Sequence, residues 1–397
     1  MTPVAKAQLV QSLAHQLGFD LVGVAPAAPL ARAAYYRDWL AAGHAGTMRY
    51  LACNVQLRAD PGQLLPGART VICAAIGYRR ADGYVRPADV GTDCGSGPSG
   101  AEPAGVVAQY ARGRDYHVVL RDLLAELVRR LRAELDESFA ARVFVDTGPL
   151  LERELAASAG LGWIGRNTCL LNAQVGSYLV LGEIVTTLEL ATAEPVAERC
   201  GACTRCLDAC PTGALIAAHQ LDATRCLSYL TIEYRGEIAP EFHGALGTRV
   251  YGCDICQQVC PYNARAPEGT QADLNIDLLP AQIDLVTLIR LRRGEYHRLT
   301  RATAAQRARQ HMWRRNAAIA AGNVRHSTDK LRAALDEAAA DPRGIVRTAA
   351  QASVARCRTF QPCNEGRAAA SPRGGAVLDE SQSRFSRMIG GTPNGVL

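Results

Sequence analysis

The fold of this chain is decided by the stretch Cys200-Gly-Ala-Cys203-Thr-Arg-Cys206-Leu-Asp-Ala-Cys210-Pro211. Two residues separate each of the first three cysteines, three more precede the fourth, and a proline follows it. This is the spacing of a bacterial two-cluster ferredoxin, in which three cysteines hold one 4Fe-4S cube and the fourth reaches across to the other. The stretch therefore predicts two 4Fe-4S clusters.

The remaining ligands are found further along the chain. A second run, Cys253-Asp-Ile-Cys256-Gln-Gln-Val-Cys260-Pro261, also ends in a proline, and its last cysteine is expected to cross back to the first cube. Cys226 fills the place that is still open. We assign cluster one to Cys200, Cys203, Cys206 and Cys260, and cluster two to Cys210, Cys226, Cys253 and Cys256.

A pair of structural zinc sites is the competing interpretation, because Cys-x2-Cys pairs are also zinc-ribbon spacing. Four cysteines within eleven residues, followed by proline, favour iron and sulfur. The Cys-x3-Cys-x2-Cys spacing of radical S-adenosylmethionine enzymes is absent. The other cysteines are expected to be ordinary buried or idle thiols, namely Cys53, Cys73, Cys94, Cys169, Cys357 and Cys363.

The composition is that of a globular protein of 397 residues, 48% hydrophobic and 21% charged, with room for two or three domains. No apolar run is long enough to span a membrane, and the start of the sequence lacks an export pattern. Cysteines at two-residue gaps in such a chain indicate metal rather than disulfides. We expect a cytoplasmic monomer in a reducing compartment, without membrane contact.

Positive charge is concentrated toward the C-terminus. The net charge is +6, yet residues 285–360 hold sixteen Arg or Lys against five Asp or Glu. GC-rich codon usage is the simpler cause of the preference for Arg over Lys, but it does not explain this segregation. The charge distribution therefore indicates a nucleic-acid partner.

Helical and strand patterns alternate before the cysteine runs. Leucines at helical spacing predict a helix over 115–137, and a strand over 142–145 runs into Asp146-Thr147-Gly148-Pro149, where a side chain can line a pocket. A further helix is expected over 3–18, and further strands over 19–25, 70–75 and 178–190. Residues 86–105, rich in Gly, Pro and Ser, predict a mobile surface insertion.

Beyond Pro261 the sequence becomes rich in Arg and Ala. Arg315-Asn316-Ala317-Ala318 and Arg347-Thr348-Ala349-Ala350 resemble one another, and Asp341-Pro342 is similar to the start of the second helix of a HEAT repeat. One or two such units are too few for a stable solenoid, so this region must lean on the preceding domain. Residues 361–397 predict a disordered tail.

Four motifs outside the first cysteine run carry a family resemblance. They are Tyr110-Ala111-Arg112-Gly113-Arg114-Asp115-Tyr116-His117, Asp146-Thr147-Gly148-Pro149-Leu150-Leu151-Glu152-Arg153, Gly160-Leu161-Gly162-Trp163-Ile164-Gly165-Arg166-Asn167-Thr168 and Cys226-Leu227-Ser228-Tyr229-Leu230-Thr231-Ile232-Glu233. In this order they resemble the epoxyqueuosine reductase family, over about residues 5–325. The resemblance implies reduction of epoxyqueuosine to queuosine at the wobble position of tRNA, the final step of queuosine biosynthesis. It implies cobalamin and two 4Fe-4S clusters as cofactors, and tRNA and an external electron donor as partners.

The patterns and the resemblance together imply an α+β fold in four parts. These are a corrinoid-binding catalytic α/β domain over 1–190, a bacterial-type two-cluster ferredoxin domain over 191–268, a HEAT-like helical tRNA-binding region over 275–360, and the tail.

Individual site residues also follow from the resemblance. Asp146 matches the family's proton donor, and an acid that keeps its proton near neutral pH needs burial to raise its pKa. Arg58 is aligned with a corrinoid-contacting arginine, with a solvated surface arginine as the alternative. The implied cobalamin contacts are Arg58, Ala108, Asp146, Leu170, Leu181, Ile232, Cys253 and Asp254. The implied tRNA contacts are Tyr234 and Arg235. From their positive charge, the basic helices around Arg314, Arg315, Arg343 and Arg347 are expected to hold the anticodon stem by its backbone.

Two other classes of protein fit parts of the pattern. A cobalamin-dependent reductive dehalogenase would share the cofactors, and an iron-sulfur electron carrier would bind clusters and no corrinoid. The Asp-x-His-x-x-Gly signature of histidine-ligated corrinoid proteins is missing, and His117 is expected to cap or pack a helix. Gly160-x-Gly162-x-x-Gly165 matches a dinucleotide fingerprint but follows a helical pattern, so it indicates a helix exit instead.

Overall fold

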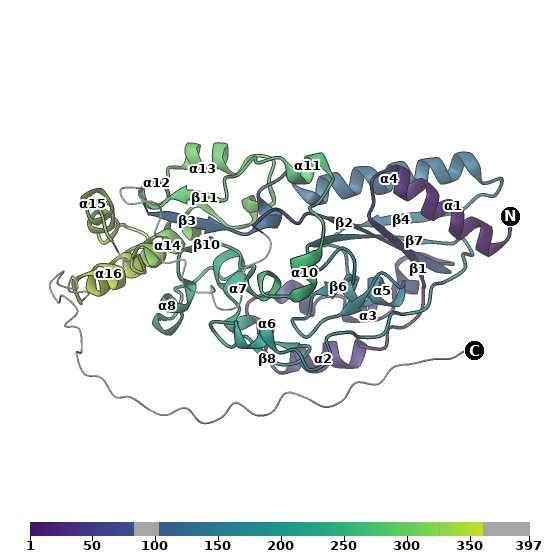
Figure 1. Cartoon of the computed structure of the whole chain (residues 1–397), viewed down its shortest axis with the longest axis horizontal. Coiled ribbons are helices and arrows are strands. Elements are labelled where there is room, and N and C mark those ends of the chain that lie inside the picture. The colour runs from purple at the N-terminus through teal and green to yellow at the C-terminus, as the bar shows by residue number, and fades with distance from the viewer. Residues whose placement is uncertain (83–102, 325, 360–397) are drawn as a thin grey trace, which may run out of the picture. The chain divides into compact units, whose positions relative to one another are not determined.

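The computed structural model describes residues 1–82, 103–324 and 326–359, which form a mixed α+β fold (Figure 1). The central sheet has the strand order β1-β2-β7-β4, and every neighbouring pair in it is antiparallel. Its strands are β1 (Leu21–Pro26), β2 (Thr70–Gly77), β4 (Ala141–Phe144) and β7 (Leu179–Thr186). All residues of β2 are buried, as expected for a central strand that is covered on both faces.

Helices cover both faces of this sheet (Figure 1). On one face, α1 (Pro3–Gln16) and α4 (Tyr116–Glu134) share a core with Ile72 of β2. On the other face, α5 (Glu152–Ser158) packs in a second core with Cys73. Because successive side chains of a strand point to opposite faces of the sheet, Ile72 and Cys73 lie in different hydrophobic cores.

The local predictions for this region are confirmed. The helix expected over 115–137 is α4, and it begins where the Asp115 side chain accepts the backbone N–H of His117. The strand expected over 142–145 is β4, which places Asp146 in the turn that follows it.

A second sheet joins distant parts of the chain. Its central strand β3 (Ala104–Val107) pairs in parallel with β10 (Arg249–Tyr251) and antiparallel with β11 (Gln282–Asp284). One hydrophobic core contains residues from all three of the folded domains that were predicted from the sequence. Residues 1–359 form one compact unit. The domain boundaries therefore stay predictions.

The C-terminal region is helical. α14 (Gln310–Ala321) packs against α12 (Leu285–Ile289), α15 (Asp329–Ala338) and α16 (Gly344–Thr359) and belongs to the core beneath the second sheet. This packing agrees with the expectation that the helices lean on the preceding domain, while their likeness to a HEAT repeat stays a prediction.

The remaining helices and strands of the described residues are short. The helices are α2 (Ala33–Ala41), α3 (Val55–Ala59), α6 (Arg205–Asp208), α7 (Leu227–Ile232), α8 (His243–Leu246), α9 (Ile255–Gln258), α10 (Pro261–Arg265), α11 (Ala272–Asn275) and α13 (Arg293–Leu299). The strands are β5 (Trp163–Ile164), β6 (Leu170–Leu171), β8 (Leu215–Ala217) and β9 (Gln220–Leu221). The 3-10 turns are η1 (Arg49–Ala52), η2 (Pro61–Leu64), η4 (Gln109–Ala111), η5 (Ala223–Arg225), η6 (Pro240–Phe242) and η7 (Ala304–Arg307).

Two predictions fall mainly outside the described residues. The insertion over 86–105 coincides largely with 83–102, and the tail over 361–397 lies beyond residue 359. The end of the insertion is corrected, because Ala104 and Gly105 belong to β3, where a Cβ on Gly105 would lie 2.5 Å from Val250. None of the helices in the described ranges combines the length and apolar character that a bilayer span requires.

Candidate functional site

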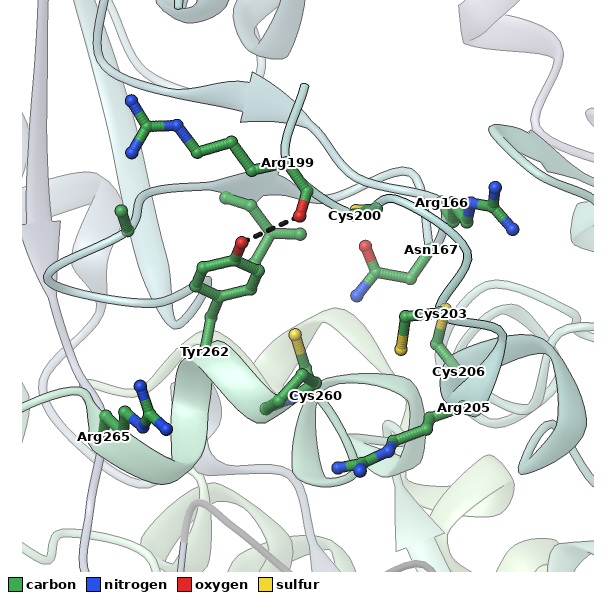
Figure 2. A pocket seen from close by; sticks show the side chains of 13 residues that line it. Arg166, Asn167, Arg199, Cys200, Cys203, Arg205, Cys206, Cys260, Tyr262 and Arg265 are labelled. Atoms are coloured by element: carbon green, nitrogen blue, oxygen red, sulfur yellow. Dashed lines mark hydrogen bonds between the residues drawn. The ribbon is translucent and has the colours of Figure 1, made fainter. Parts of the chain in front are cut away.

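Four cysteines of the two runs line one cavity of about 340 Å³. Figure 2 shows Cys200, Cys203, Cys206 and Cys260 around it, contributed by α6, the loop before it, and the residue preceding α10. These are the cysteines assigned to cluster one by spacing. The indole Nε1 of Trp163 donates to the Sγ of Cys200 at 3.4 Å, a contact of the kind that tunes cluster sulfurs.

The other four candidate ligands form a second group. Cys226 lies near Cys210, and both Cys253 and Cys256 lie near Cys226. Cys169 belongs to this group as well, because its thiol contacts that of Cys256. The expectation that Cys169 is an idle thiol without ligand-like partners is therefore wrong. Within the described ranges, no three thiol, imidazole or carboxylate groups converge on a single metal ion.

A larger cavity of about 540 Å³ adjoins the second group of cysteines. Cys169 lines it, so this thiol contacts both the cavity and Cys256. Half of the residues implied as cobalamin contacts line the same cavity, namely Arg58, Asp146, Leu170 and Leu181. Its aromatic lining was not singled out from the sequence and consists of Tyr35, Tyr36, Trp39, Tyr78, Tyr110 and Tyr116.

Asp146 is fixed by its turn and by three neighbours. Its φ of 53° lies in the left-handed region, which few residues other than glycine, asparagine and aspartate adopt. Oδ2 accepts a hydrogen bond from the Tyr116 hydroxyl and lies beside His117 Nε2, each at 3.0 Å. The backbone N–H of Asp146 donates to the carboxyl group of Glu152. The carboxyl of Asp146 is thereby held at the cavity lining.

The protonation of this site differs from the expectation based on burial. The Asp146 side chain is 53% exposed, and although its enclosure beside the cavity disfavours the ionised form, the hydrogen bond and charge of His117 and the hydroxyl of Tyr116 outweigh this and lower the pKa of Asp146. Burial also opposes charging of His117, yet its contacts with Asp115 and Asp146 raise the pKa of His117 to about 9. The expectation of a raised pKa for Asp146 is wrong, and at neutral pH the proton resides on His117.

Arg58 supports the loop that follows Asp146. Its side chain is buried, so the alternative of a solvated surface arginine is wrong. Nη1 donates to the carbonyls of Gly148 at 3.3 Å and Leu150 at 3.5 Å, and Nε donates to that of Cys53 at 3.4 Å. Arg58 therefore ties α3 to the loop that follows Asp146 while lining the cavity.

The other four implied cobalamin contacts lie around Gly252, which has a φ of 71°. A Cβ on Gly252 would lie 2.5 Å from Ala108 and 3.7 Å from Ile232, so only glycine fits. Asp254 is buried, accepts the backbone N–H of Gln109 at 2.8 Å, and has its pKa raised to about 6 by burial. None of these four residues, Ala108, Ile232, Cys253 and Asp254, lines the 540 Å³ cavity.

The implied stem contacts are only partly available to RNA. Arg315 is wholly buried and donates to the carbonyls of Tyr234 at 2.8 Å and Gly236 at 2.6 Å, so its expected role on phosphate is wrong. Arg314 is paired with Asp341 at 2.7 Å. Both arginines stabilise the fold. Arg315 provides hydrogen-bond donors for backbone carbonyls, and Arg314 neutralises the buried carboxylate of Asp341.

Three exposed arginines form what we call the basic patch, namely Arg235, Arg309 and Arg343. They surround His311, whose pKa is lowered by burial and by their positive charges. Tyr234, next to the patch, is half-buried and packs against Tyr229 with ring centroids 5.9 Å apart. Of the two implied tRNA contacts, Arg235 is thus the accessible one.

Related proteins match this chain over nearly their whole length. Epoxyqueuosine reductase of Xanthomonas campestris is 39% identical over 87% of this chain and 94% of its own, and that of Gloeobacter violaceus is 42% identical over 79% and 95%. The crystal structure of epoxyqueuosine reductase with a tRNA-Tyr epoxyqueuosine-modified stem loop matches with a TM-score of 0.78 at 29% identity, over 88% and 90% of the two chains. The structure from Streptococcus thermophilus matches with a TM-score of 0.75 at 28% identity, over 90% and 95%.

Two family models match separate parts of the chain. Residues 199–263 match the 4Fe-4S double cluster binding domain, which confirms the prediction of two clusters over the zinc alternative. The fold and the site together define an iron-sulfur oxidoreductase. Residues 58–147 match the model described as epoxyqueuosine reductase QueG, DUF1730. The chain belongs to the epoxyqueuosine reductase family.

Proposed function

We propose that this protein reduces epoxyqueuosine to queuosine at the wobble position of tRNA. Opening the epoxide and removing its oxygen as water consumes two electrons and two protons. One observation carries the proposal: Asp146, with its proton-bearing neighbour, and Cys169, in contact with a cluster-two candidate, line the same cavity. Family membership favours this activity over a reductive dehalogenase and over a simple electron carrier.

Electrons reach the cavity through the two clusters in this proposal. The cysteines of cluster one line a cavity of their own, whereas Cys256 of cluster two contacts Cys169, which lines the 540 Å³ cavity. α6, which carries Cys206, packs against α9, which carries Cys256, so the two groups of ligands are adjacent. An external donor therefore reduces cluster one, and cluster two passes electrons onward.

Cobalamin is the cofactor proposed for the larger cavity. In the described lining, the ring of His219 is engaged on both sides, with Nδ1 3.1 Å from the Gly165 carbonyl and Nε2 3.4 Å from Glu198. The described lining thus offers no free imidazole to a corrinoid that would bind there. Arg58, Leu170 and Leu181 would hold it. When bound and reduced to cobalt(I), cobalamin supplies the electron pair.

Proton delivery is the task of the residues around Asp146. The protonated His117 lies 3.0 Å from Asp146 Oδ2 and is held from its other side by Asp115 at 2.7 Å. As negative charge develops on the epoxide oxygen, Asp146 takes a proton from His117 and passes it to that oxygen. Tyr116 keeps the carboxyl oriented throughout.

The experiment that tests the function uses protein reconstituted with iron, sulfide and cobalamin. With a low-potential reductant and tRNA that contains epoxyqueuosine, we expect queuosine as the nucleoside product in mass spectrometry. Omitting cobalamin should abolish the product. A protein that holds clusters but gives no corrinoid absorption spectrum would instead be an electron carrier. Size-exclusion chromatography of the same preparation tests the expected monomer.

Binding of tRNA is expected to depend on the basic patch. Replacing both Arg235 and Arg343 by alanine should weaken binding of an anticodon stem loop and lower the slope of log affinity against log salt by about one per lost phosphate contact. Fluorescence anisotropy at several salt concentrations measures both. Arg298→Ala, exposed on α13, is the matched control. An unchanged slope in the double variant would contradict the proposed contact.

A further inference from the structure

Two neighbouring carboxyl groups lie close to Asp146 and have no role in the mechanism above. Glu183 is in the middle of β7, between Cys73 of β2 and Phe144 of β4, and is 0% exposed. No hydrogen-bond donor in the described part of the chain reaches either of its carboxyl oxygens. Its neighbour is the side chain of Glu152, which also lines the 540 Å³ cavity. One member of the pair is therefore enclosed and the other faces the reaction.

A single shared proton explains this arrangement. A buried carboxylate without a donor is costly, and two adjacent carboxylates repel one another. If one group is protonated, it becomes the missing donor for the other. Burial and the charge of Asp146 raise the pKa of Glu152 to about 8, although Arg153 and His117 act against this rise. Burial and the charges of Glu152 and Asp146 raise the pKa of Glu183 as well. The pair holds a proton at neutral pH.

We propose that the pair formed by Glu152 and Glu183 supplies the second proton of the reaction. This inference rests on the proposed function, because that reaction consumes two protons. Both carbon–oxygen bonds of the epoxide break, a carbon–carbon double bond forms, and the two electrons come from the reduced cofactor. The first proton reaches the oxygen through Asp146 from His117. The second leaves Glu152 into the cavity, so that the oxygen departs as water, and solvent protonates the pair again.

Infrared spectroscopy tests the pair without cobalamin or tRNA. The carboxylic-acid carbonyl band of the wild type should disappear as pH rises through about 8. Glu152→Gln leaves Glu183 as the only carboxyl group of the pair, so the band should change in frequency and be lost at a different pH. Glu183→Gln places an amide donor beside Glu152 and stabilises its charge, so the loss should occur about one pH unit lower or more. Glu189→Gln, at the surface beside Arg69, is the matched control. A wild type without a protonated carboxyl group at neutral pH overturns the inference.

Turnover separates this inference from the proposed function. Glu152→Gln should lower the single-turnover rate by about 100-fold, with cluster content, corrinoid spectrum and tRNA affinity unchanged. Glu183→Gln should shift the alkaline limb of the pH dependence of the single-turnover rate to lower pH. If Glu152→Gln loses a cofactor, the pH dependence of Glu183→Gln alone tests the role of the pair. If the wild type forms queuosine and neither variant alters the rate or the profile, only the pair's role is wrong. If the wild type forms none, the proposed function is wrong.

A second, independent observation concerns the cavity of cluster one. Four arginines line it together with the cysteines, namely Arg166, Arg199, Arg205 and Arg265. Figure 2 shows these side chains on different sides of the cysteines. Three of them are exposed, and no described carboxylate forms an ion pair with any of the four. The nearest acidic neighbour in sequence, Glu198, is directed to His219 at 3.4 Å. The exposed arginines therefore place positive charge on this face that no ion pair with a described carboxylate neutralises.

We propose that this face docks an acidic electron-carrier protein. The proposed reaction needs electrons from outside, and a carrier must come close to cluster one to deliver them. Unpaired arginines around that cluster attract and orient a negatively charged partner, and they suit the small polar interface of a transient complex.

Stopped-flow reduction of the clusters tests the docking face, with a reduced acidic plant-type ferredoxin as the probe. Charge reversal of both Arg199 and Arg265 to glutamate should slow reduction by ferredoxin roughly 10- to 100-fold at low salt, while dithionite reduces the clusters at an unchanged rate. Replacement of both by lysine should retain most of the rate, and Arg129→Glu on α4 is the control.

Three results for the charge-reversal variant would overturn the docking role. Reduction by dithionite could be slowed as much as reduction by ferredoxin, or reduction by ferredoxin could be unaffected. The variant could also lose binding of the tRNA stem loop while ferredoxin still reduces it at the wild-type rate. Reduction is read without cobalamin or tRNA, so the result is separate from the proposed function.

Discussion

Asp146→Asn is expected to lower the rate of queuosine formation by about 100- to 10,000-fold, the usual contribution of a positioned acid. Asparagine tolerates the left-handed φ of 53° and can still pair with Tyr116, so the turn should persist. Its amide cannot take a proton from His117 and pass it on. The loss should therefore appear in the chemical step, measured by single turnover with prereduced protein.

The controls for this variant follow from its neighbours. Cluster content, the corrinoid spectrum and stem-loop affinity should equal those of the wild type, and Asp336→Asn, exposed on α15, should have the wild-type rate.

Asp115→Asn removes one of the contacts that raise the pKa of His117 to about 9. That variant should lose activity at a lower pH than the wild type, because His117 then gives up its proton earlier. A wild-type rate for Asp146→Asn with full cofactors would refute its role as donor.

The fold could be predicted wherever the pattern is local. The leucine spacing of α4 and the apolar run of β2 each encode one element, and both are found where expected. The second sheet could not be predicted, because β3, β10 and β11 are short and come from distant segments. Gly105 reads as part of a loose Gly-rich segment, yet it lies in β3, where Val250 leaves no room for a Cβ and therefore requires glycine.

In the candidate site, too, the residues that could be predicted are those marked by a local pattern in the sequence. Cysteine spacing predicts the cluster ligands because a cube constrains short loops, and the strand end locates Asp146. Cys169 and Glu183 acquire their meaning only through tertiary contacts with Cys256 and Glu152. The charge of Arg315 predicts phosphate binding, but the direction of a side chain is decided by packing, and its guanidinium is turned inward.

Cys226→Ala is expected to remove cluster two and to reduce queuosine formation to the background rate. Iron and acid-labile sulfide should be roughly halved, because one of two four-iron clusters remains. Turnover fails even though cluster one is intact, since the cysteines beside the 540 Å³ cavity belong to the group that Cys226 joins. Iron analysis and the EPR spectrum of the reduced protein measure the first effect, and nucleoside analysis measures the second.

The same measurement decides whether Cys210 or Cys169 completes cluster two, since both lie near Cys226. If Cys210 is the crossing ligand, Cys210→Ala should lose half of the iron, whereas Cys169→Ser should keep both clusters. Cys53→Ser, an exposed thiol beside the Arg49 carbonyl, is the matched control for cysteine replacement. The reverse pattern of iron loss would show that the second cube is closed by the thiol that lines the cavity. Cluster two would then have a ligand in direct contact with the reaction site, and electrons would pass through Cys169 itself.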